Sequence, residues 1–273
     1  MIWSREMRAA TDRMSIGLKL YSTDTALIPE AMVLYERDLF QFIELYLTPR
    51  TPREMIGQWK RLGVPFVIHA AHSLHGINLA QAEREKDNVQ YFGETSRIAD
   101  MLGSSWIIAH GGNNGSILET IRQIGLMGDN RIVIENKPKI GLRDEACIGW
   151  SPADFQKIAD TGRLYGFVLD FAHASCAARS EGIDEAKMIE SFLALHPVVF
   201  HLSDGNAISE KDTHLNLGKG NRDLGFYVGC VPLDGYITLE TPRNPATGLD
   251  DFVRDAAFLS ALLQKHEISQ RGG

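Results

Sequence analysis

The residues of this chain that could do chemistry stand where its short apolar segments end. From residue 65 onward, six successive segments each end at a His, Asp or Glu. Imidazole nitrogens and carboxylate oxygens are the protein ligands of Zn²⁺, Mn²⁺ and Fe²⁺. The residue types therefore predict a metal site, whose candidate ligands are His72, His110, Glu135, Asp170, His173, His201, Asp212, His214 and Glu240.

The number of candidate ligands indicates more than one ion. One ion takes about four to six ligands, whereas the chain offers five histidines and four acids. Such a set suits two or three ions that share bridging carboxylates. Ions about 3.5–4 Å apart stabilise the attacking and leaving oxygens of a phosphoryl displacement and activate a water at neutral pH. We therefore expect a phosphoester hydrolase.

The elements that must position these residues alternate in type. Apolar segments rich in Ile, Val and Phe are typical of buried strands, and they cover residues 15–21, 39–47, 65–71, 105–110, 131–135, 165–170, 198–202 and 235–240. Amphipathic stretches predict helices at 53–62, 79–102, 116–127, 152–161, 184–195 and 249–265. Ser151 and Pro152 are typical of a helix start, and Gly63 and Gly103 of positions just past a helix end.

This alternation predicts an α/β fold, namely a single (β/α)8 barrel. The alternative is a doubly wound open sheet, which usually has a glycine-rich first turn, and no such turn follows Tyr21. We expect one domain over residues 1–273, with an N-terminal extension at 1–14. The strand ends of a barrel meet at one mouth, so the candidate ligands would share one pocket. Residues 204–235 lack periodicity, which predicts a functional loop.

The composition narrows the class of protein. Hydrophobic residues make up 44% and charged residues 23% of the 273 residues, as in a globular protein. The net charge of −7 argues against nonspecific coating of nucleic acid. Apolar runs fall short of the ~18 residues that span a bilayer, and the charged start differs from a signal peptide. Three scattered cysteines fit a reducing compartment. We expect a cytoplasmic protein without a membrane partner.

Taken in chain order, these motifs resemble the endonuclease IV family (type 2 apurinic/apyrimidinic endonucleases), within the xylose-isomerase-like TIM barrels. The resemblance covers about residues 63–242. Each motif is short, and all of them occur in the expected order. The matching segments are His72-Ser-Leu-His-Gly-Ile-Asn78, His110-Gly-Gly, Ile134-Glu135-Asn136, Leu169-Asp170-Phe-Ala-His173, His201-Leu-Ser-Asp204, Asp212-Thr-His214-Leu-Asn-Leu-Gly218-Lys-Gly220-Asn221 and Leu239-Glu240-Thr.

The resemblance implies three zinc ions, although the same ligands accept Mn²⁺ or Fe²⁺. His72, His110 and Glu135 would hold the first ion, and Glu135 would bridge to a second. That second ion would also be held by Asp170, His201 and Glu240, and the third by His173, Asp212 and His214. In the family, a metal-bridging hydroxide attacks the phosphorus 5′ of an abasic site in DNA. Glu135 and Glu240 are the expected catalytic carboxylates.

The positions that grip DNA in the family differ here. The family has a bulky pair that wedges into the DNA stack, whereas this chain has His75 and Gly76. In the loop after the second strand, Arg50 alone could take the place of the family's DNA-reading side chains. Where the family has small residues after Glu135-Asn136, this chain has Lys137-Pro138-Lys139. We therefore expect an intact set of metal ligands and an altered set of DNA contacts.

Several polar residues are candidate substrate contacts: Lys19, Arg50, His75, Asn78, Lys137 and Lys219, with Lys139 and Arg222 as further rim cations. For some of them a second interpretation stays open. Lys19 could neutralise a carboxylate inside the barrel, and His75 could be a solvated loop residue. The 218–220 segment could cradle a phosphate or be a plain loop. His69 is expected to be a packed or supporting histidine rather than a ligand.

Two other functions compete with an abasic-site endonuclease. The first is a sugar or sugar-phosphate isomerase or epimerase of the same superfamily. Such an enzyme would hold one divalent ion on Glu135, Asp170, His201 and Glu240, and it would have little use for the other five ligands. The second is a trinuclear hydrolase that acts on a different phosphoester. No protein partner can be inferred from the sequence.

Overall fold

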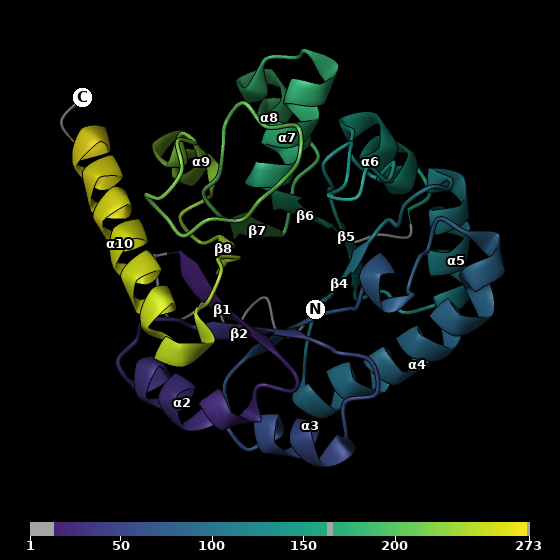
Figure 1. The fold of residues 1–273 in the computed structure, drawn as a ribbon, viewed down its shortest axis with the longest axis horizontal. Helices are drawn as coiled ribbons and strands as arrows, with labels where there is room; N and C mark the ends of the chain where they lie inside the picture. The colour runs from purple at the N-terminus through teal and green to yellow at the C-terminus, as the bar shows by residue number, and fades with distance from the viewer. Residues whose placement is uncertain (1–13, 163–165, 272–273) are drawn as a thin grey trace.

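Eight parallel strands close into a barrel in chain order, from β1 to β8, in a computed structural model that describes residues 14–162 and 166–271. Helices surround the strands in a ring (Figure 1). The predicted (β/α)8 barrel is confirmed. The strands are β1 (Ser15–Tyr21), β2 (Phe42–Tyr46), β3 (Phe66–His69), β4 (Ile107–His110), β5 (Ile132–Glu135), β6 (Phe167–Asp170), β7 (Val199–Leu202) and β8 (Tyr236–Leu239).

The outer ring contains the predicted helices and three that the sequence patterns did not indicate. The predicted ones are α3 (Arg53–Lys60), α4 (Glu85–Leu102), α5 (Ile117–Met127), α6 (Pro152–Ala159), α8 (Glu185–Leu193) and α10 (Asp250–Arg271). The others are α2 (Ile28–Glu36), α7 (Phe171–Glu181) and α9 (Leu224–Cys230). Eight residues of α7 are buried, His173 and Ser175 among them, so the helix shows no clear amphipathic period. Short 3-10 turns lie at Thr25–Leu27, Ser73–His75, Ala82–Arg84 and Pro245–Thr247.

Two predicted helix ends are confirmed in atomic detail. The Ser151 hydroxyl accepts a hydrogen bond from the backbone N–H of Asp154, and Pro152 occupies the first helical position of α6. At the other end of a helix, Gly103 closes α4 with φ of 65°, a left-handed conformation that favours glycine.

The interior of the barrel has an apolar floor. One side chain from each of β2 to β7 contributes to a separate cluster of buried residues: Phe42, Val67, Ile108, Val133, Val168 and Val199. Alternate residues along a strand point to the same side of the sheet. The residue two positions further along each strand must therefore also point inward, nearer the C-terminal mouth. Those residues are Glu44, His69, His110, Glu135, Asp170 and His201. The strand period thus places a polar layer directly above the apolar floor.

Some expectations concern residues outside the described part. The proposed N-terminal extension at 1–14 lies there except for Met14, which is buried in the core. Tyr165, the first residue of the predicted strand at 165–170, lies there as well. Among the described residues, no helix has both the length and the apolar character needed to cross a membrane.

Candidate metal centre

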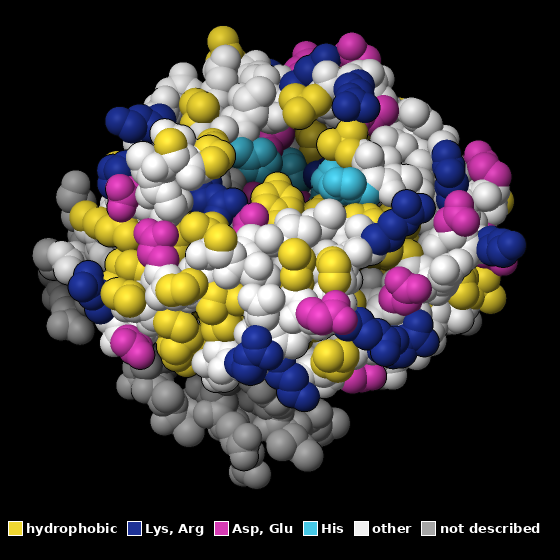
Figure 2. Space-filling model, turned by 60° about the horizontal axis from the view of Figure 1, so that its bottom comes forward, with side chains coloured by type: hydrophobic (Ala, Val, Ile, Leu, Met, Phe, Trp, Pro, Cys, Tyr) yellow, Lys and Arg dark blue, Asp and Glu magenta, His cyan; other side chains and the backbone are white. Residues whose placement is uncertain are grey.

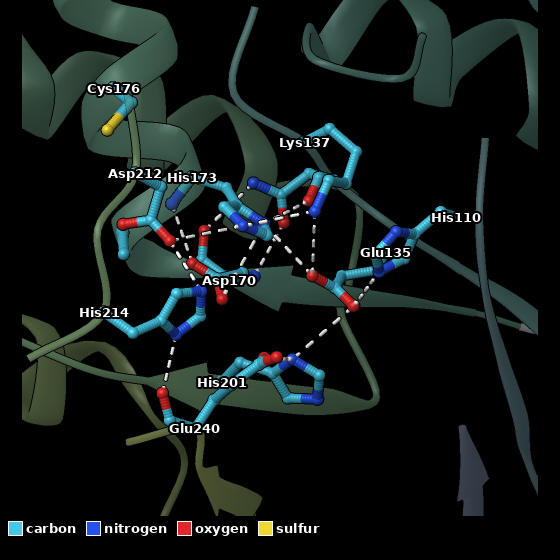
Figure 3. A network of polar contacts seen from close by, with 12 residues as sticks. His110, Glu135, Lys137, Asp170, His173, Cys176, His201, Asp212, His214 and Glu240 are labelled. Carbon is cyan, nitrogen blue, oxygen red and sulfur yellow. Dashed lines mark hydrogen bonds and ion pairs between the residues drawn. The ribbon is translucent and has the colours of Figure 1, made fainter. Parts of the chain in front are cut away.

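Four ligands converge from the last four strands of the barrel. Glu135, Asp170, His201 and Glu240 each offer a ligand atom, and these atoms lie within 4.8 Å of one another. We refer to these residues as the β5–β8 group. Register explains the convergence, because Asp170 pairs with His201 across β6 and β7. His201 Nδ1 lies 2.7 Å from Glu240 Oε2 and 3.6 Å from Glu135 Oε2. Figure 3 shows these side chains directed toward one another.

The start of α7 fixes part of this arrangement. Asp170 ends β6 and caps α7, where its Oδ1 accepts a hydrogen bond from the N–H of His173 at 2.7 Å. Its other oxygen, Oδ2, has no hydrogen-bond partner. The cap also brings His173 to the barrel mouth one turn later. One carboxylate therefore starts the helix and leaves its second oxygen free for a cation.

A second cluster, the loop group, consists of His173, Asp212 and His214. Asp212 Oδ2 lies 2.7 Å from His214 Nε2 and 3.5 Å from His173 Nε2. His214 Nδ1 donates to the backbone oxygen of Glu240 at 2.6 Å, which leaves its Nε2 free to face the cluster. The loop after β7 thus carries two ligands to the mouth. A functional role for that loop remains a prediction.

The third cluster contains His69, His110 and Glu135, and we call it the β3–β5 group. His69 Nε2 and His110 Nε2 each lie 3.1 Å from Glu135 Oε2. This cluster differs from the one expected, because His69 takes the place that the sequence motif gave to His72. β3 ends at His69, two residues beyond the inward-facing Val67, so the strand period turns its ring into the barrel.

His72 lies outside this cluster, next to His110. It lies in the loop after β3, where it caps a 3-10 turn and its Nδ1 accepts from the N–H of Leu74 at 3.4 Å. Its ring stacks on that of His110 with a centroid distance of 5.0 Å. Burial lowers the pKa of His72 to about 3, so the ring is neutral. The motif spacing favoured His72 over His69, and the strand parity that distinguishes them was available from the sequence.

Buried polar atoms without hydrogen-bond partners show that the site suits cations. Buried polar atoms are nearly always hydrogen-bonded, so a group of orphans requires an explanation. Five of these atoms belong to the candidate ligands: Glu135 Oε1, Asp170 Oδ2, His201 Nδ1, Asp212 Oδ2 and Glu240 Oε2. All five are of the types that ligate divalent metals. The donor set and the orphaned atoms therefore both fit metal ions.

Neighbouring carboxylates raise the pKa of two candidate histidine ligands. Burial alone would lower the pKa of His214, but the Asp212 carboxylate outweighs it and raises that pKa to about 10. Burial likewise acts against the charged form of His201, yet Glu44 and Glu240 hold its pKa well above the usual value. Burial raises the pKa of Asp170. With raised pKa values, these three side chains bind protons more readily. A bound cation would displace those protons and supply the positive charge in their place.

Lys19 lies beside carboxylates inside the barrel. Its Nζ is 2.6 Å from Glu240 Oε1 and 3.1 Å from Glu44 Oε1. Burial would lower the pKa of Lys19, but these two carboxylates more than offset it and raise the pKa. Of the two interpretations left open for Lys19, this geometry favours the neutralising partner.

The other predicted substrate contacts divide into two kinds. Lys137 enters the centre, with Nζ 3.3 Å from His173 Nε2 and 4.0 Å from Glu135 Oε1. Arg50 and Lys219 lie on exposed loop positions. His75 and Asn78 bond within the protein: His75 Nδ1 pairs with the Tyr46 hydroxyl, and the Asn78 side chain bonds to Asn113. Substrate contact by these residues remains a prediction.

One expected rim cation lies in the interior instead. Arg222 is 6% exposed, and its guanidinium donates to the oxygen of Ala172, to Cys176 Sγ and to Asp212 Oδ1. The side chain is buried because it pairs with a ligand carboxylate and ties it to α7. Lys139 also has partners, since it pairs with Glu181 and lies over the Trp150 ring. The expectation that Arg222 contacts phosphates at the rim was therefore wrong.

An exposed apolar side chain beside the centre was not anticipated. Leu74 is 57% exposed. It lines a polar cavity of about 340 Å³ together with Gly76, Asn113, Arg84 and Arg143. Gly76 has φ of 84°, which closes the turn after His75. Histidine side chains are visible in a hollow of the molecular surface (Figure 2).

Comparison with known proteins assigns the chain to a family. Residues 33–262 match the xylose isomerase-like TIM barrel family, and the chain belongs to it. A curated relative, the probable endonuclease 4 of Thermoplasma acidophilum, is 29% identical over 173 residues. That match covers 59% of this chain and 60% of the relative, so the chain spans about three fifths of the relative's length. The resemblance to the endonuclease IV family is thereby confirmed.

Solved structures with the same fold have more than one function. Endonuclease IV from Thermus thermophilus has a TM-score of 0.65 and 20% identity, with 92% of this chain and 99% of that chain covered. A D-tagatose 3-epimerase-like protein has a TM-score of 0.67 and 18% identity, with 95% and 100% covered. At these identities the likeness concerns the fold alone.

Proposed function

We propose that the protein is a metal-dependent phosphoester hydrolase that binds up to three divalent ions, with zinc as the expected metal. The observation that carries this proposal is the loop group of His173, Asp212 and His214, which lies next to the β5–β8 group. Two further ligands, His69 and His110, meet Glu135 on its other side. A one-metal enzyme has no use for this second and third set.

The chain's own residues have separable roles in this proposal. The β5–β8 group, the loop group and the β3–β5 group would each hold one ion, and Glu135 would belong to two of the sites. The bound ions would supply an activated water and positive charge for phosphoryl oxygens. The Lys137 side chain is 16% exposed at the mouth of the same centre, where its ammonium would contact a phosphoryl oxygen of the substrate.

Abasic DNA is the substrate class that the resemblance to the endonuclease IV family implies, and the similarity to a probable endonuclease 4 supports it. Gly76 offers no side chain that could enter the DNA stack, whereas Leu74 is exposed at the same rim. Leu74 therefore takes the role of the apolar contact in this proposal, and Arg50 and Lys219 contact backbone phosphates. The three free cysteines, Cys147, Cys176 and Cys230, suit a reducing compartment, so we place the activity in the cytoplasm.

A sugar isomerase or epimerase with one metal ion is the second candidate. The β5–β8 group alone could hold the single divalent ion that such an enzyme needs. The fold likeness to a D-tagatose 3-epimerase-like protein is consistent with this second candidate.

Metal counting together with activity assays separates the candidates. The full chain is loaded with zinc or manganese, freed of excess metal and measured by elemental analysis. It is then assayed on an abasic duplex, on simple phosphodiesters and on ketose substrates. We expect close to three ions per chain and cleavage of a phosphoester. About one ion per chain with sugar epimerisation would overturn the hydrolase proposal in favour of the second candidate.

A further inference from the structure

Two charged residues inside the barrel belong to none of the three ligand groups. Glu44 on β2 is fully buried, and the side chain of Lys19 on neighbouring β1 is 15% exposed. The two residues face each other in register. Burying a charge is costly unless the charge is compensated. A carboxylate and an ammonium in the barrel interior therefore call for a specific function.

Glu44 holds the far side of the His201 ring. Its Oε2 accepts hydrogen bonds from His201 Nε2 at 2.9 Å and from the Thr238 hydroxyl at 2.7 Å. Because Nε2 carries the proton in this bond, Nδ1 is the nitrogen left to face Glu240 and Glu135. The contact with Glu44 thus selects both the orientation of the ring and the nitrogen that can bind a metal.

Lys19 restrains the neighbouring carboxylate. Its ammonium lies 2.6 Å from Glu240 Oε1, while Glu240 Oε2 faces the centre without a hydrogen-bond partner. The same ammonium contacts Glu44 Oε1 at 3.1 Å and compensates its charge. Lys19 therefore occupies one oxygen of Glu240 and leaves the other oxygen for a cation.

We propose that Glu44 and Lys19 are positioning residues with opposite effects on the metal bound by the β5–β8 group. Glu44 orients His201 and makes its ring a stronger ligand, as carboxylates behind metal-bound histidines do. Lys19 limits Glu240 to one ligand oxygen and places a competing positive charge beside the site. The inference rests on the metal centre of the proposed function, and it is independent of the substrate.

The test measures zinc release, not turnover. The full chain is loaded with zinc, and transfer of the metal to a chromogenic chelator is followed over time for wild type, Glu44→Gln and Lys19→Met. We expect Glu44→Gln to release zinc from one site about 10- to 100-fold faster, the range typical of such supporting contacts. We expect Lys19→Met to release it more slowly than wild type, since Glu240 then gains a second free oxygen.

The opposite signs distinguish positioning from a purely structural role. If both residues merely stabilised the barrel, both variants would release zinc faster. Asp129→Asn is the matched control, because Asp129 forms an ion pair with Arg131 in the segment that precedes β5, away from the ligands. It should release zinc at the wild-type rate. Wild-type release from Glu44→Gln, or faster release from Lys19→Met, would overturn the proposal.

Further measurements keep the test decisive if a single variant misfolds. In the double variant Lys19→Met/Glu44→Gln, both buried charges are removed together, a change that is often tolerated. It should release zinc faster than Lys19→Met alone, and equal rates would contradict the role of Glu44. The ring proton of His201 should give a protected resonance in wild type that shifts in Glu44→Gln. A wild-type chain that binds no zinc would instead refute the proposed function.

Discussion

Glu135 connects the parts of the candidate centre more than any other described ligand. It is fully buried at the end of β5 and belongs to both the β3–β5 group and the β5–β8 group. Its carboxylate also lies 3.0 Å from His173 Nδ1, which is part of the loop group. Burial acts to raise its pKa, but His110, His201 and Lys137 keep that pKa well below the usual value. Glu135 is therefore ionised and available to two ions at once.

Replacing this carboxylate should lower the rate of phosphoester hydrolysis more than replacing any single histidine. Glu135→Gln keeps the shape but removes the charge from two sites, so we expect phosphoester hydrolysis to fall at least ~100-fold, comparable to the loss of a key electrostatic group. Elemental analysis should show fewer bound ions than in wild type. Retention of most of the activity together with all the metal would contradict the bridging role.

His69 and His72 offer a direct comparison of strand geometry with motif spacing. His69 lies 3.1 Å from Glu135, whereas His72 caps a turn beside it. We expect His69→Ala to lose one ion per chain and His72→Ala to retain its metal content, as measured by elemental analysis of the loaded proteins. The reverse result would return His72 to the ligand set and make His69 a supporting residue.

The protons held at the centre predict a pH dependence of metal binding. Because Asp212 raises the pKa of His214 to about 10, a cation must displace a proton from this ring at every pH below that value. The apparent zinc affinity should therefore rise with pH between about 6 and 9, by up to tenfold per unit for each displaced proton. Competition with a chelator of known affinity, repeated at each pH, measures this. A flat profile would show that no proton is displaced.

At the scale of elements, the loop after β7 decides whether the loop group exists. Asp204 stands at its start and exchanges two backbone hydrogen bonds with Leu215. Its carboxylate accepts from the N–H groups of Gly205 and Gly220, each at 2.8 Å. Gly220 approaches so closely that an added Cβ would lie 2.2 Å from the backbone oxygen of Gly205. These contacts close the loop that carries Asp212 and His214.

Removing the Asp204 carboxylate should loosen this loop and release the third ion. In Asp204→Ala three backbone donors, the N–H groups of Gly205, Gly220 and Arg222, lose a charged acceptor, which costs on the order of 2–4 kcal/mol. We expect a lower melting temperature and about one ion fewer per chain, with the other sites kept. Asp223→Ala is the matched control, since Asp223 caps α9 in the same segment through the N–H of Phe226. It should lose only about 1 kcal/mol and no metal. Equal metal loss in both variants would contradict the role of Asp204.

For the whole molecule, charge and surface shape determine how DNA could bind. The net charge of −7 weakens attraction to a phosphate backbone, and Arg222 is not available at the rim. Extruding an abasic nucleotide costs a few kcal/mol of unstacking, which inserted side chains normally offset. Leu74, on the loop after β3, is one of the exposed apolar side chains on the loops that follow the strands. Binding to duplex DNA should thus depend on few contacts.

We therefore expect weak incision of an abasic duplex that declines steeply as salt rises from about 50 to 200 mM. Hydrolysis of a small phosphodiester should change little over that range, which provides the internal control. Leu74→Ala should lower incision of the duplex while sparing the small substrate. Efficient incision at physiological salt would show that other side chains supply the grip, and an equal effect of Leu74→Ala on both substrates would exclude a wedge role.

The sequence was sufficient to predict the barrel architecture and most of the candidate metal ligands. The alternation of apolar segments and helices predicts the barrel because strand and helix periods are local properties. Eight of the nine predicted ligands fall into the three clusters, because most stand at or just after a strand end and barrel topology brings strand ends together. The other two, Asp212 and His214, lie in the loop after β7. The helices α2, α7 and α9 were not predicted, since their apolar residues are spread around the helix by burial or occur in too short a stretch.

Only the tertiary structure determined which neighbours each side chain meets. The closure of the barrel places the inward-facing His69 ring 3.1 Å from Glu135. The closure of the barrel brings Lys19 and Glu44, from the first two strands, against Glu240 and His201 from the last two. Arg222 lies in the interior because its loop folds back onto α7 and Asp212. The sequence contains these residues and their types, but contacts across more than 150 positions depend on how the sheet closes on itself.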